Sequence, residues 1–173
     1  MNFKIPFYDI VNFFLTGLVA VCGLIILVPG VPSSITNNAV ISKMCDMPGD
    51  FELIISVFVF ACSYEVGLVV NRIGSTVVEP ILKKLKLIPF DDNYKLYNER
   101  KKEFPIMDVL SREYAVSRTG ATLFFLLAFL ALLGPFKAIS ILFLLITALF
   151  IISCRKHAAK IVILMAATPK PNK

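Results

Sequence analysis

The sequence predicts an all-α integral membrane protein with four transmembrane helices and a small helical cytoplasmic extension between the second and third. Apolar residues make up 57% of the 173-residue chain, and its mean hydropathy is +0.79, whereas soluble domains hold about 45–50% apolar residues. These residues fall into four runs that are close to the ~20 residues a helix needs to cross a bilayer. The apolar excess must face lipid, so we expect a single membrane domain over residues 1–173.

The first predicted span is the uncharged run 10–28, which stops at Pro29 and Gly30. A helix of this length is close to the hydrocarbon thickness of a bilayer. A cleaved signal peptide is the alternative for an apolar run near the N-terminus, but its apolar region is usually about 7–15 residues long. We therefore interpret this run as a span.

The remaining spans are predicted at 53–70, 119–133 and 138–154. The last two are separated by Gly134-Pro-Phe-Lys137, which is typical of a tight turn between antiparallel helices. None of the runs shows the alternation of barrel strands, and backbone groups in lipid must be satisfied internally. Helices are therefore the expected spanning structure.

The distribution of charge predicts the orientation. The segment 71–118 holds ten basic and seven acidic residues, and the tail 155–173 holds five basic residues and no acid. The opposite side retains only Lys43 and Lys137 as basic residues. Because Lys and Arg concentrate in cytoplasmic loops, we expect both termini and the long segment to be cytoplasmic. The net charge of +6 is then a topology signal, and no direct nucleic-acid binding is expected.

Motifs for chemistry are scarce. The four cysteines show no C-x-x-C spacing, so neither a disulfide framework nor a zinc site is predicted. The chain also lacks a P-loop, a G-x-S-x-G elbow and an H-E-x-x-H motif. We therefore expect no catalytic residue, no metal and no cofactor, and we do not expect an enzyme.

Glu65 is the one ionisable residue well inside a predicted span, where a charge costs about 2.5–3.5 kcal/mol. Arg72 and Glu79 follow at intervals of seven, which places all three on one face of a continuous helix. They are candidates for a polar path through an oligomer, together with neighbouring polar residues of the same helix: Glu65, Arg72, Glu79, Ser63 and Asn71. The alternative is that Glu65 is protonated or paired and only locks the bundle.

Two further groups have a predicted role. Small residues at 56, 67 and 74 lie at spacings that let helices approach closely, so Ser56, Gly67 and Gly74 are candidates for helix packing. Arg112, Glu113 and Arg118 precede the third span and are candidates for a charged ring at a cytoplasmic pore mouth. Interfacial snorkelling is the simpler interpretation of these charges.

Three segments carry a resemblance to a known family: Phe7-Tyr-Asp-Ile-Val-Asn-Phe-Phe-Leu-Thr-Gly17, Tyr64-Glu-Val-Gly-Leu-Val-Val-Asn-Arg-Ile-Gly-Ser75 and Arg112-Glu-Tyr-Ala-Val-Ser-Arg118. In these segments, span arrangement and length, the chain resembles small bacterial membrane proteins of phage defence, among them the accessory membrane protein of type VI-B CRISPR systems. The resemblance implies an oligomeric pore in the bacterial inner membrane that acts beside an RNA-guided ribonuclease.

The same family is described with a divergent HEPN-type pair, in which an arginine precedes a histidine by about five to seven positions. Before His157, the only histidine, those positions hold Phe150, Ile151 and Ile152, and Arg155 lies two residues away. Arg155 and His157 are the nearest candidates for such a pair. The departure argues against ribonuclease activity.

Two functions remain open from the sequence. The first is a homo-oligomeric, membrane-depolarising pore, since a path through the membrane explains charges at Glu65 and Arg72. The second is a non-conducting anchor that recruits a protein or anionic lipid through its basic cytoplasmic loop and tail. An enzyme acting on lipid or RNA would need a constellation that the sequence does not show.

Overall fold

The computed structural model describes residues 7–28, 50–89 and 93–167, and these residues form helices joined by short connections. The helices are α1 (Phe7–Leu27), α4 (Asp50–Ile73), a π-helical turn η1 (Gly74–Val78), α5 (Glu79–Lys84), α6 (Tyr94–Glu103), α7 (Ile106–Leu133) and α8 (Lys137–Ala166). Four helical stretches are long and apolar enough to cross a membrane: Phe7–Leu27, Ser56–Lys84, Ile106–Leu133 and Lys137–Ala166. The predicted all-α membrane fold is confirmed.

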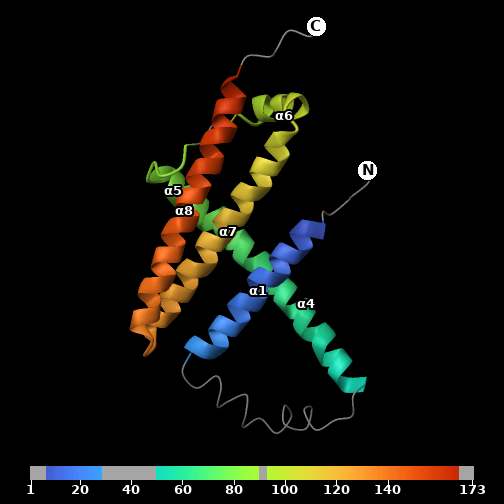
Figure 1. Cartoon of the computed structure of the whole chain (residues 1–173), viewed down its shortest axis with the longest axis vertical. Coiled ribbons are helices and arrows are strands. Elements are labelled where there is room, and N and C mark those ends of the chain that lie inside the picture. The colour runs from blue at the N-terminus through green and yellow to red at the C-terminus, as the bar shows by residue number, and fades with distance from the viewer. Residues whose placement is uncertain (1–6, 29–49, 90–92, 168–173) are drawn as a thin grey trace.

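The helices form two pairs (Figure 1). α7 and α8 lie side by side as a long antiparallel hairpin, whereas α1 and α4 cross as an X, and α6 lies across the start of α7. α7 also packs on α1 and on α4, so it joins the two pairs. The predicted hairpin at Gly134 is therefore present, and α7 is the central helix of the described protomer.

The helices α7 and α8 extend well past the predicted spans at the ends opposite their hairpin turn. α7 begins at Ile106 and α8 continues to Ala166, whereas the predicted spans are 119–133 and 138–154. The helices continue because these charged extensions still carry apolar residues on the sides that face each other. Tyr114, Cys154 and Ala158 pack with Leu82 and Ile88 in one buried cluster. Most of the predicted tail 155–173 is thus helical, although residues 168–173 lie outside the described part of the chain.

The segment 71–118 is helical throughout most of its described length. α4 continues without a break through η1 into α5, past Pro80, a residue type that usually kinks or ends a helix. Pro80 has no N–H to donate, and in a regular α-helix its ring would collide with the carbonyl of Thr76. The wider π turn lies at this point, with the Glu79 N–H donating to the Gly74 carbonyl. It lets the helix continue through the proline.

Asp is a common residue at helix N-caps, but Asp108 lies inside the first turn of α7, because the helix begins two residues earlier at Ile106. Its carboxylate oxygen lies 2.6 Å from the Lys101 ammonium on α6. This hydrogen bond raises the pKa of Lys101. The pair ties α6 to the start of α7.

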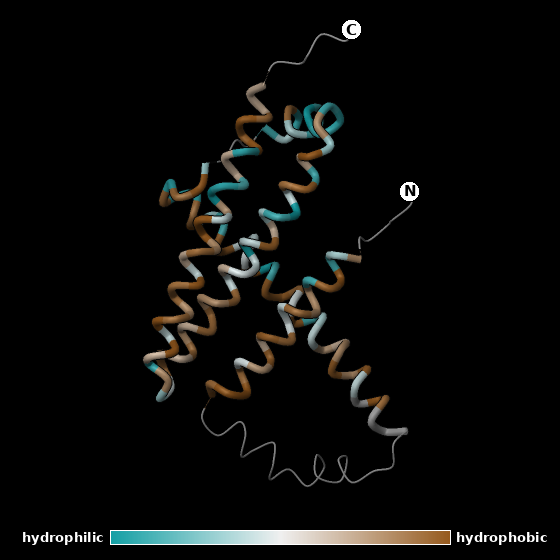
Figure 2. The backbone as a smooth tube through the Cα atoms, viewed as in Figure 1, coloured by the Kyte–Doolittle hydropathy of each residue, from teal (hydrophilic) through white to brown (hydrophobic). Residues whose placement is uncertain are grey.

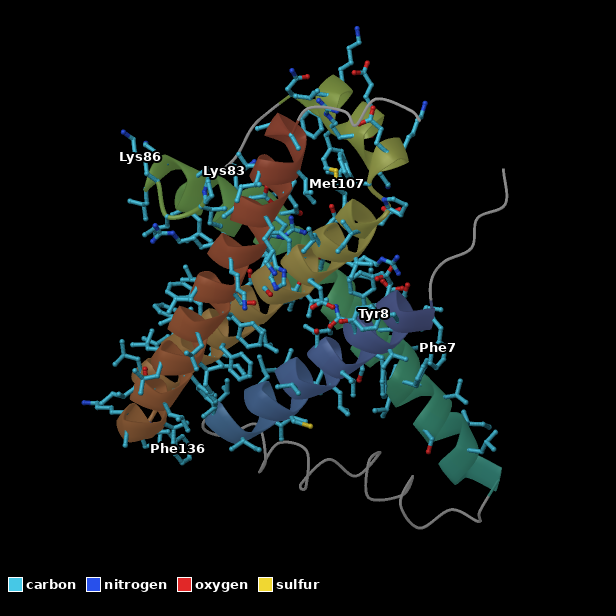
Figure 3. The ribbon with its side chains drawn as sticks, turned by 45° about the horizontal axis from the view of Figure 1, so that its top comes forward. Phe7, Tyr8, Lys83, Lys86, Met107 and Phe136 are labelled. Atoms are coloured by element: carbon cyan, nitrogen blue, oxygen red, sulfur yellow. The ribbon has the colours of Figure 1, made fainter. Side chains whose placement is uncertain are left out.

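Charge and apolar surface are separated along the molecule. Hydrophilic residues gather on α5, on α6 and at the start of α7, while the rest of the helices are mostly apolar (Figure 2). Figure 3 places Lys83 and Lys86 near that end and Phe136 at the opposite tip of the α7–α8 hairpin. Large apolar side chains of α4 and α8 are exposed, such as Phe58, Val57, Leu145 and Leu149. Such exposure is unfavourable in water and expected in lipid.

Most of the predicted loop 29–52 between the first two spans, including Lys43 and Cys45, lies outside the described residues. The last three positions of this loop belong to α4, which begins at Asp50. Lys170 and Lys173 of the tail are likewise outside them.

Candidate functional site: a polar cluster beside a helix crossing

A cluster of polar side chains links the α4–η1–α5 helix to α7. The Arg118 guanidinium forms an ion pair with Glu79, whose other carboxylate oxygen lies 3.0 Å from the Lys83 ammonium. The Asn71 carboxamide oxygen accepts two hydrogen bonds, at 3.2 Å from Arg118 Nη2 and at 2.9 Å from Thr119 Oγ1. We call Asn71, Glu79, Lys83, Arg118 and Thr119 the polar cluster. Its members come from separate segments, so only the fold assembles it.

Gly74 makes room for this cluster. A Cβ at position 74 would lie 2.9 Å from Thr122 Oγ1 and 3.6 Å from Arg118 Cγ, so a larger residue would force the Thr122 side chain or α7 to shift. The π turn that starts at Gly74 also changes which side chains face α7. It holds about one extra residue per turn, which rotates the following residues by about 100° relative to an α-helix. Glu79 then faces Arg118.

The predicted ladder of Glu65, Arg72 and Glu79 is therefore not one continuous face. Glu65 and Arg72 are exposed on α4, whereas Glu79 is 12% exposed and turned toward α7. The seven-residue interval between Arg72 and Glu79 includes the π turn, and this breaks the register that a regular α-helix would keep. Glu79 belongs to the polar cluster and no longer to the candidate path.

Glu65 lies near the middle of the membrane-spanning part. α1 holds 21 residues with Gly17 at its centre, so at about 1.5 Å per residue it matches the ~30 Å hydrocarbon core. A Cβ at Gly17 would overlap the Ser63 carbonyl oxygen of α4, so the two helices cross at that depth. Glu65 is two residues from Ser63. No described residue forms an ion pair or side-chain hydrogen bond with the Glu65 carboxylate.

The crossing of α1 and α4 is built from small residues. A Cβ at Gly67 would overlap the Phe13 carbonyl oxygen of α1, and Ser63 is 1% exposed. Gly67 and Gly74 are thus both close-packed, Gly67 against α1 and Gly74 against α7. Ser63 packs at the crossing and does not lie on a polar path, which corrects its assignment. Ser56 is exposed, two turns before the crossing, and is not part of this contact.

The three candidates for a pore mouth do not share one environment. Arg118 is turned inward to Glu79 and Asn71, whereas Arg112 is exposed and Glu113 is half-buried. The side chain of Arg118 is 13% exposed in the protomer. It is a structural partner of α5, so Arg112 and Glu113 remain the candidates for a charged rim.

Arg155 and His157 do not form a site in the described protomer. Arg155 is exposed and His157 is half-buried, with its Nδ1 buried and without a hydrogen-bond partner. Residues two positions apart on an α-helix differ by about 200° in direction, so the Arg155 and His157 side chains point to opposite sides of α8. Among the described residues, no group of three or more His, Cys, Asp or Glu is placed to hold a metal ion.

Sequence reasoning missed two features beside the polar cluster. Tyr114 of α7 is buried under the Arg118 guanidinium, whose Cζ lies 5.8 Å from its ring centroid. A cavity of about 210 Å³ opens next to both residues, between α5, α6, α7 and α8. Tyr114 and Arg118 are four residues apart in the sequence, a spacing that places two side chains on one face of a helix. This spacing could have indicated their contact.

Comparisons of the chain with protein families, with curated proteins and with solved structures found no match.

Proposed function

We propose that several copies of this chain assemble into a homo-oligomeric pore that depolarises the membrane. Glu65 carries the proposal. It is exposed on α4 at the depth of the Gly17 crossing and has no partner among the described residues. A charge facing lipid there costs about 2.5–3.5 kcal/mol, and intramembrane carboxylates typically face a bundle interior or a water-filled path. Neighbouring copies that enclose water would supply that environment.

The exposed surface of α4 supports an assembly through this helix. From Leu53 to Cys62 its described side chains are exposed, and beyond the crossing Arg72 is exposed as well. Arg72 follows Glu65 by two turns, about 10 Å along the axis. Four thin spans cannot enclose a channel within one protomer, so a path past Glu65 and Arg72 requires further copies.

We also propose the orientation and location of the protein. The described basic residues concentrate around α5, on α6 and in the second half of α8, toward the hydrophilic end seen in Figure 2. The positive-inside rule makes this end cytoplasmic, with both termini on the same side because the number of spans is even. On the resemblance given above, the membrane is the bacterial inner membrane.

The resemblance also suggests the physiological setting. We propose an accessory effector in antiviral defence of the CRISPR type, with an RNA-guided ribonuclease acting upstream. The chain itself would then be neither an enzyme nor a nucleic-acid-binding protein, and it would respond to the ribonuclease system through its cytoplasmic face.

The first experiment is the mass of the detergent-purified protein by light scattering, with bound detergent subtracted. A ring-sized oligomer is expected, and a monomer or dimer would contradict the pore. Flux assays in liposomes then compare Glu65→Gln with Glu99→Gln, a matched change on the exposed face of α6 outside the membrane. Cation flux should fall about tenfold for the first variant only, because this variant removes the ring of carboxylates that the copies of Glu65 would form along the path.

A second candidate function is an anchor, which the exposed lysines of the cytoplasmic end favour. Lys84, Lys86, Lys95 and Lys102 are exposed around α5 and α6, and each can add about 1 kcal/mol to the attraction of an anionic surface. Under this hypothesis Glu65→Gln leaves function intact and charge reversal of these lysines abolishes it.

A further inference from the structure

The end of α5 and the turn that follows it form a mixed apolar and basic surface. We call residues 81–87 the α5 segment. It projects from the side of the α7–α8 hairpin in both Figure 1 and Figure 3. Three apolar and two basic side chains of the segment are exposed: Ile81, Leu85, Leu87, Lys84 and Lys86.

The backbone of the α5 segment is held in place by buried neighbours and by a helix cap. Leu82 and Ile88 are 4% and 3% exposed and pack in one cluster with residues of α7 and α8. The Leu87 N–H donates to the Leu82 carbonyl at 3.0 Å, and the Lys86 N–H donates to the Lys83 carbonyl at 2.9 Å. These two hydrogen bonds are those of a Schellman cap. The exposed side chains are therefore presented from a fixed backbone.

Lys86 occupies the position of this cap at which glycine is usual. Its φ is 56°, and no other described residue except glycine has a positive φ. A Cβ makes this left-handed conformation unfavourable, so glycine would be more stable there. A lysine in such a conformation indicates that its side chain has a function. No described residue forms an ion pair with Lys84 or Lys86.

The packing of Leu82 gives the depth of the α5 segment in the membrane. Leu82 shares its buried cluster with Tyr114 of α7, which is twenty residues before Gly134. At ~1.5 Å per residue this is about 30 Å, the thickness of the hydrocarbon core. Gly134 is level with the end of α1, because a Cβ at this position would lie 3.0 Å from the Leu27 carbonyl oxygen. The α5 segment therefore lies at the opposite edge of the core, beside the lipid headgroups.

The chemistry of the α5 segment matches this depth. Acyl chains meet phosphate groups at the edge of the hydrocarbon core, and elements with exposed apolar and basic side chains bind there through both. The ammonium groups of Lys84 and Lys86 have no acidic partner among the described residues. A lipid with a net negative charge supplies the counterion, whereas a zwitterionic lipid carries its own.

We infer that the α5 segment binds the headgroup of an anionic phospholipid in the bilayer that the protein spans. The phosphate lies against the ammonium groups of Lys84 and Lys86, and Leu85 and Leu87 lie among the acyl chains. α5 continues α4 through η1, so the bound lipid holds the end of the second membrane helix. Unlike the anchor, this site takes a lipid from the protein's own bilayer. It involves neither Glu65 nor an assembly of copies, so either proposal can fail without the other.

A single tryptophan can test whether the α5 segment lies in the lipid leaflet. The chain has no Trp, so Leu85→Trp of the full chain in nanodiscs places one fluorophore in the segment. Bromine on the acyl chains quenches Trp at short range, so the emission of this variant should be quenched. Asn98→Trp, at an exposed position of α6, should keep its emission because α6 lies on the water side of the segment. An unquenched Leu85→Trp would overturn the inference.

The same fluorophore measures the preference for the headgroup. In a fixed mixture of phosphatidylcholine and phosphatidylglycerol, the bromines are placed on one lipid or on the other. Phosphatidylglycerol should be preferred at Leu85→Trp by at least about tenfold, because each lysine contributes about fivefold. Adding Lys84→Gln and Lys86→Gln should abolish the preference, while Lys95→Gln and Lys102→Gln, at exposed lysines of α6, should keep it. Equal quenching by both lipids, or equal loss in both double variants, would contradict the site.

Two further variants separate charge from folding. Lys86→Gly relieves the left-handed backbone, so it should not lower the unfolding midpoint, but the preference for phosphatidylglycerol should fall about fivefold. Lys84→Arg with Lys86→Arg retains both charges and should retain the preference. Circular dichroism and gel filtration show that each variant folds. A folded Lys86→Gly with full preference, or a folded arginine variant without it, would show that these two charges do not hold the lipid.

Discussion

Glu79 on α5 and Arg118 on α7 form an ion pair across 39 positions of the sequence, with side chains 12% and 13% exposed. The pair fastens the end of the second membrane helix to the middle helix of the fold. Lys83 and Asn71 bond the same two groups, so the pair is part of a network in which each member limits the movement of the others.

Glu79→Gln should destabilise the protein by about 3 kcal/mol, because it leaves the buried guanidinium of Arg118 without its counterion. Unfolding in mild detergent, followed by circular dichroism, measures the change. Glu103→Gln is the matched control, since Glu103 pairs with Arg100 at a side chain that is 44% exposed, and the loss there should stay below about 1 kcal/mol. Equal losses would show that the Glu79 pair is no more buried than a surface pair.

Gly67→Val should separate α1 from α4, because a Cβ at this position would overlap the Phe13 carbonyl oxygen. The expected cost is about 1–3 kcal/mol or more, the usual range for overpacking. Crosslinking between cysteines placed at Phe14 and Phe60, whose rings stack at 4.3 Å between centroids, reports the distance between the helices. Val69→Leu, at an exposed position of the same helix, should leave crosslinking unchanged.

The bond between Lys101 and Asp108 should make stability depend on pH in the alkaline range. The pKa of Lys101 is raised above its ordinary 10.5, so the folded state holds the proton more tightly than the unfolded state. The stabilisation is fully present below pH 10.5 and is lost as the pH rises through the higher pKa of the folded protein. Both side chains are more than 40% exposed, so the effect is small.

Lys101→Met therefore should lower the thermal midpoint slightly at pH 8, by an amount equivalent to less than about 1 kcal/mol. The difference from the parent protein should shrink as the pH rises above the folded pKa of Lys101. A difference that stays constant to high pH would mean that the methylene chain of Lys101, and not its charge, supports α6.

The anchor hypothesis predicts a different result for the basic surface. Changing both Lys84 and Lys86 to Glu should abolish attachment to anionic vesicles if this surface recruits lipid, since each basic residue near the surface contributes about 1 kcal/mol. The full chain in nanodiscs is used, because α5 and α6 are held on α7 by the Glu79–Arg118 and Lys101–Asp108 pairs. The pore would be favoured if the Lys84 and Lys86 double variant binds anionic vesicles normally and Glu65→Gln loses ion flux.

Several features could be predicted from the residues because they depend on local properties. The apolar runs determine that four helices cross the membrane, and Gly134-Pro135 determines the hairpin between the last two. The close-packing role of Gly67 and Gly74 also followed from side-chain size. The depth of Glu65 could be estimated as well, since position along an apolar run corresponds to position across the bilayer.

Other features were decided only by the tertiary structure. The π turn at Gly74–Val78 breaks the seven-residue ladder and turns Glu79 to Arg118, and no simple periodicity indicates a π turn. The polar cluster joins Asn71 to Thr119, 48 positions away. The sequence by itself determined which segments enter the membrane, because partition into lipid depends on composition over about twenty residues. Which charges meet depended on helix rotation and crossing, because these are set by packing between segments distant in the chain.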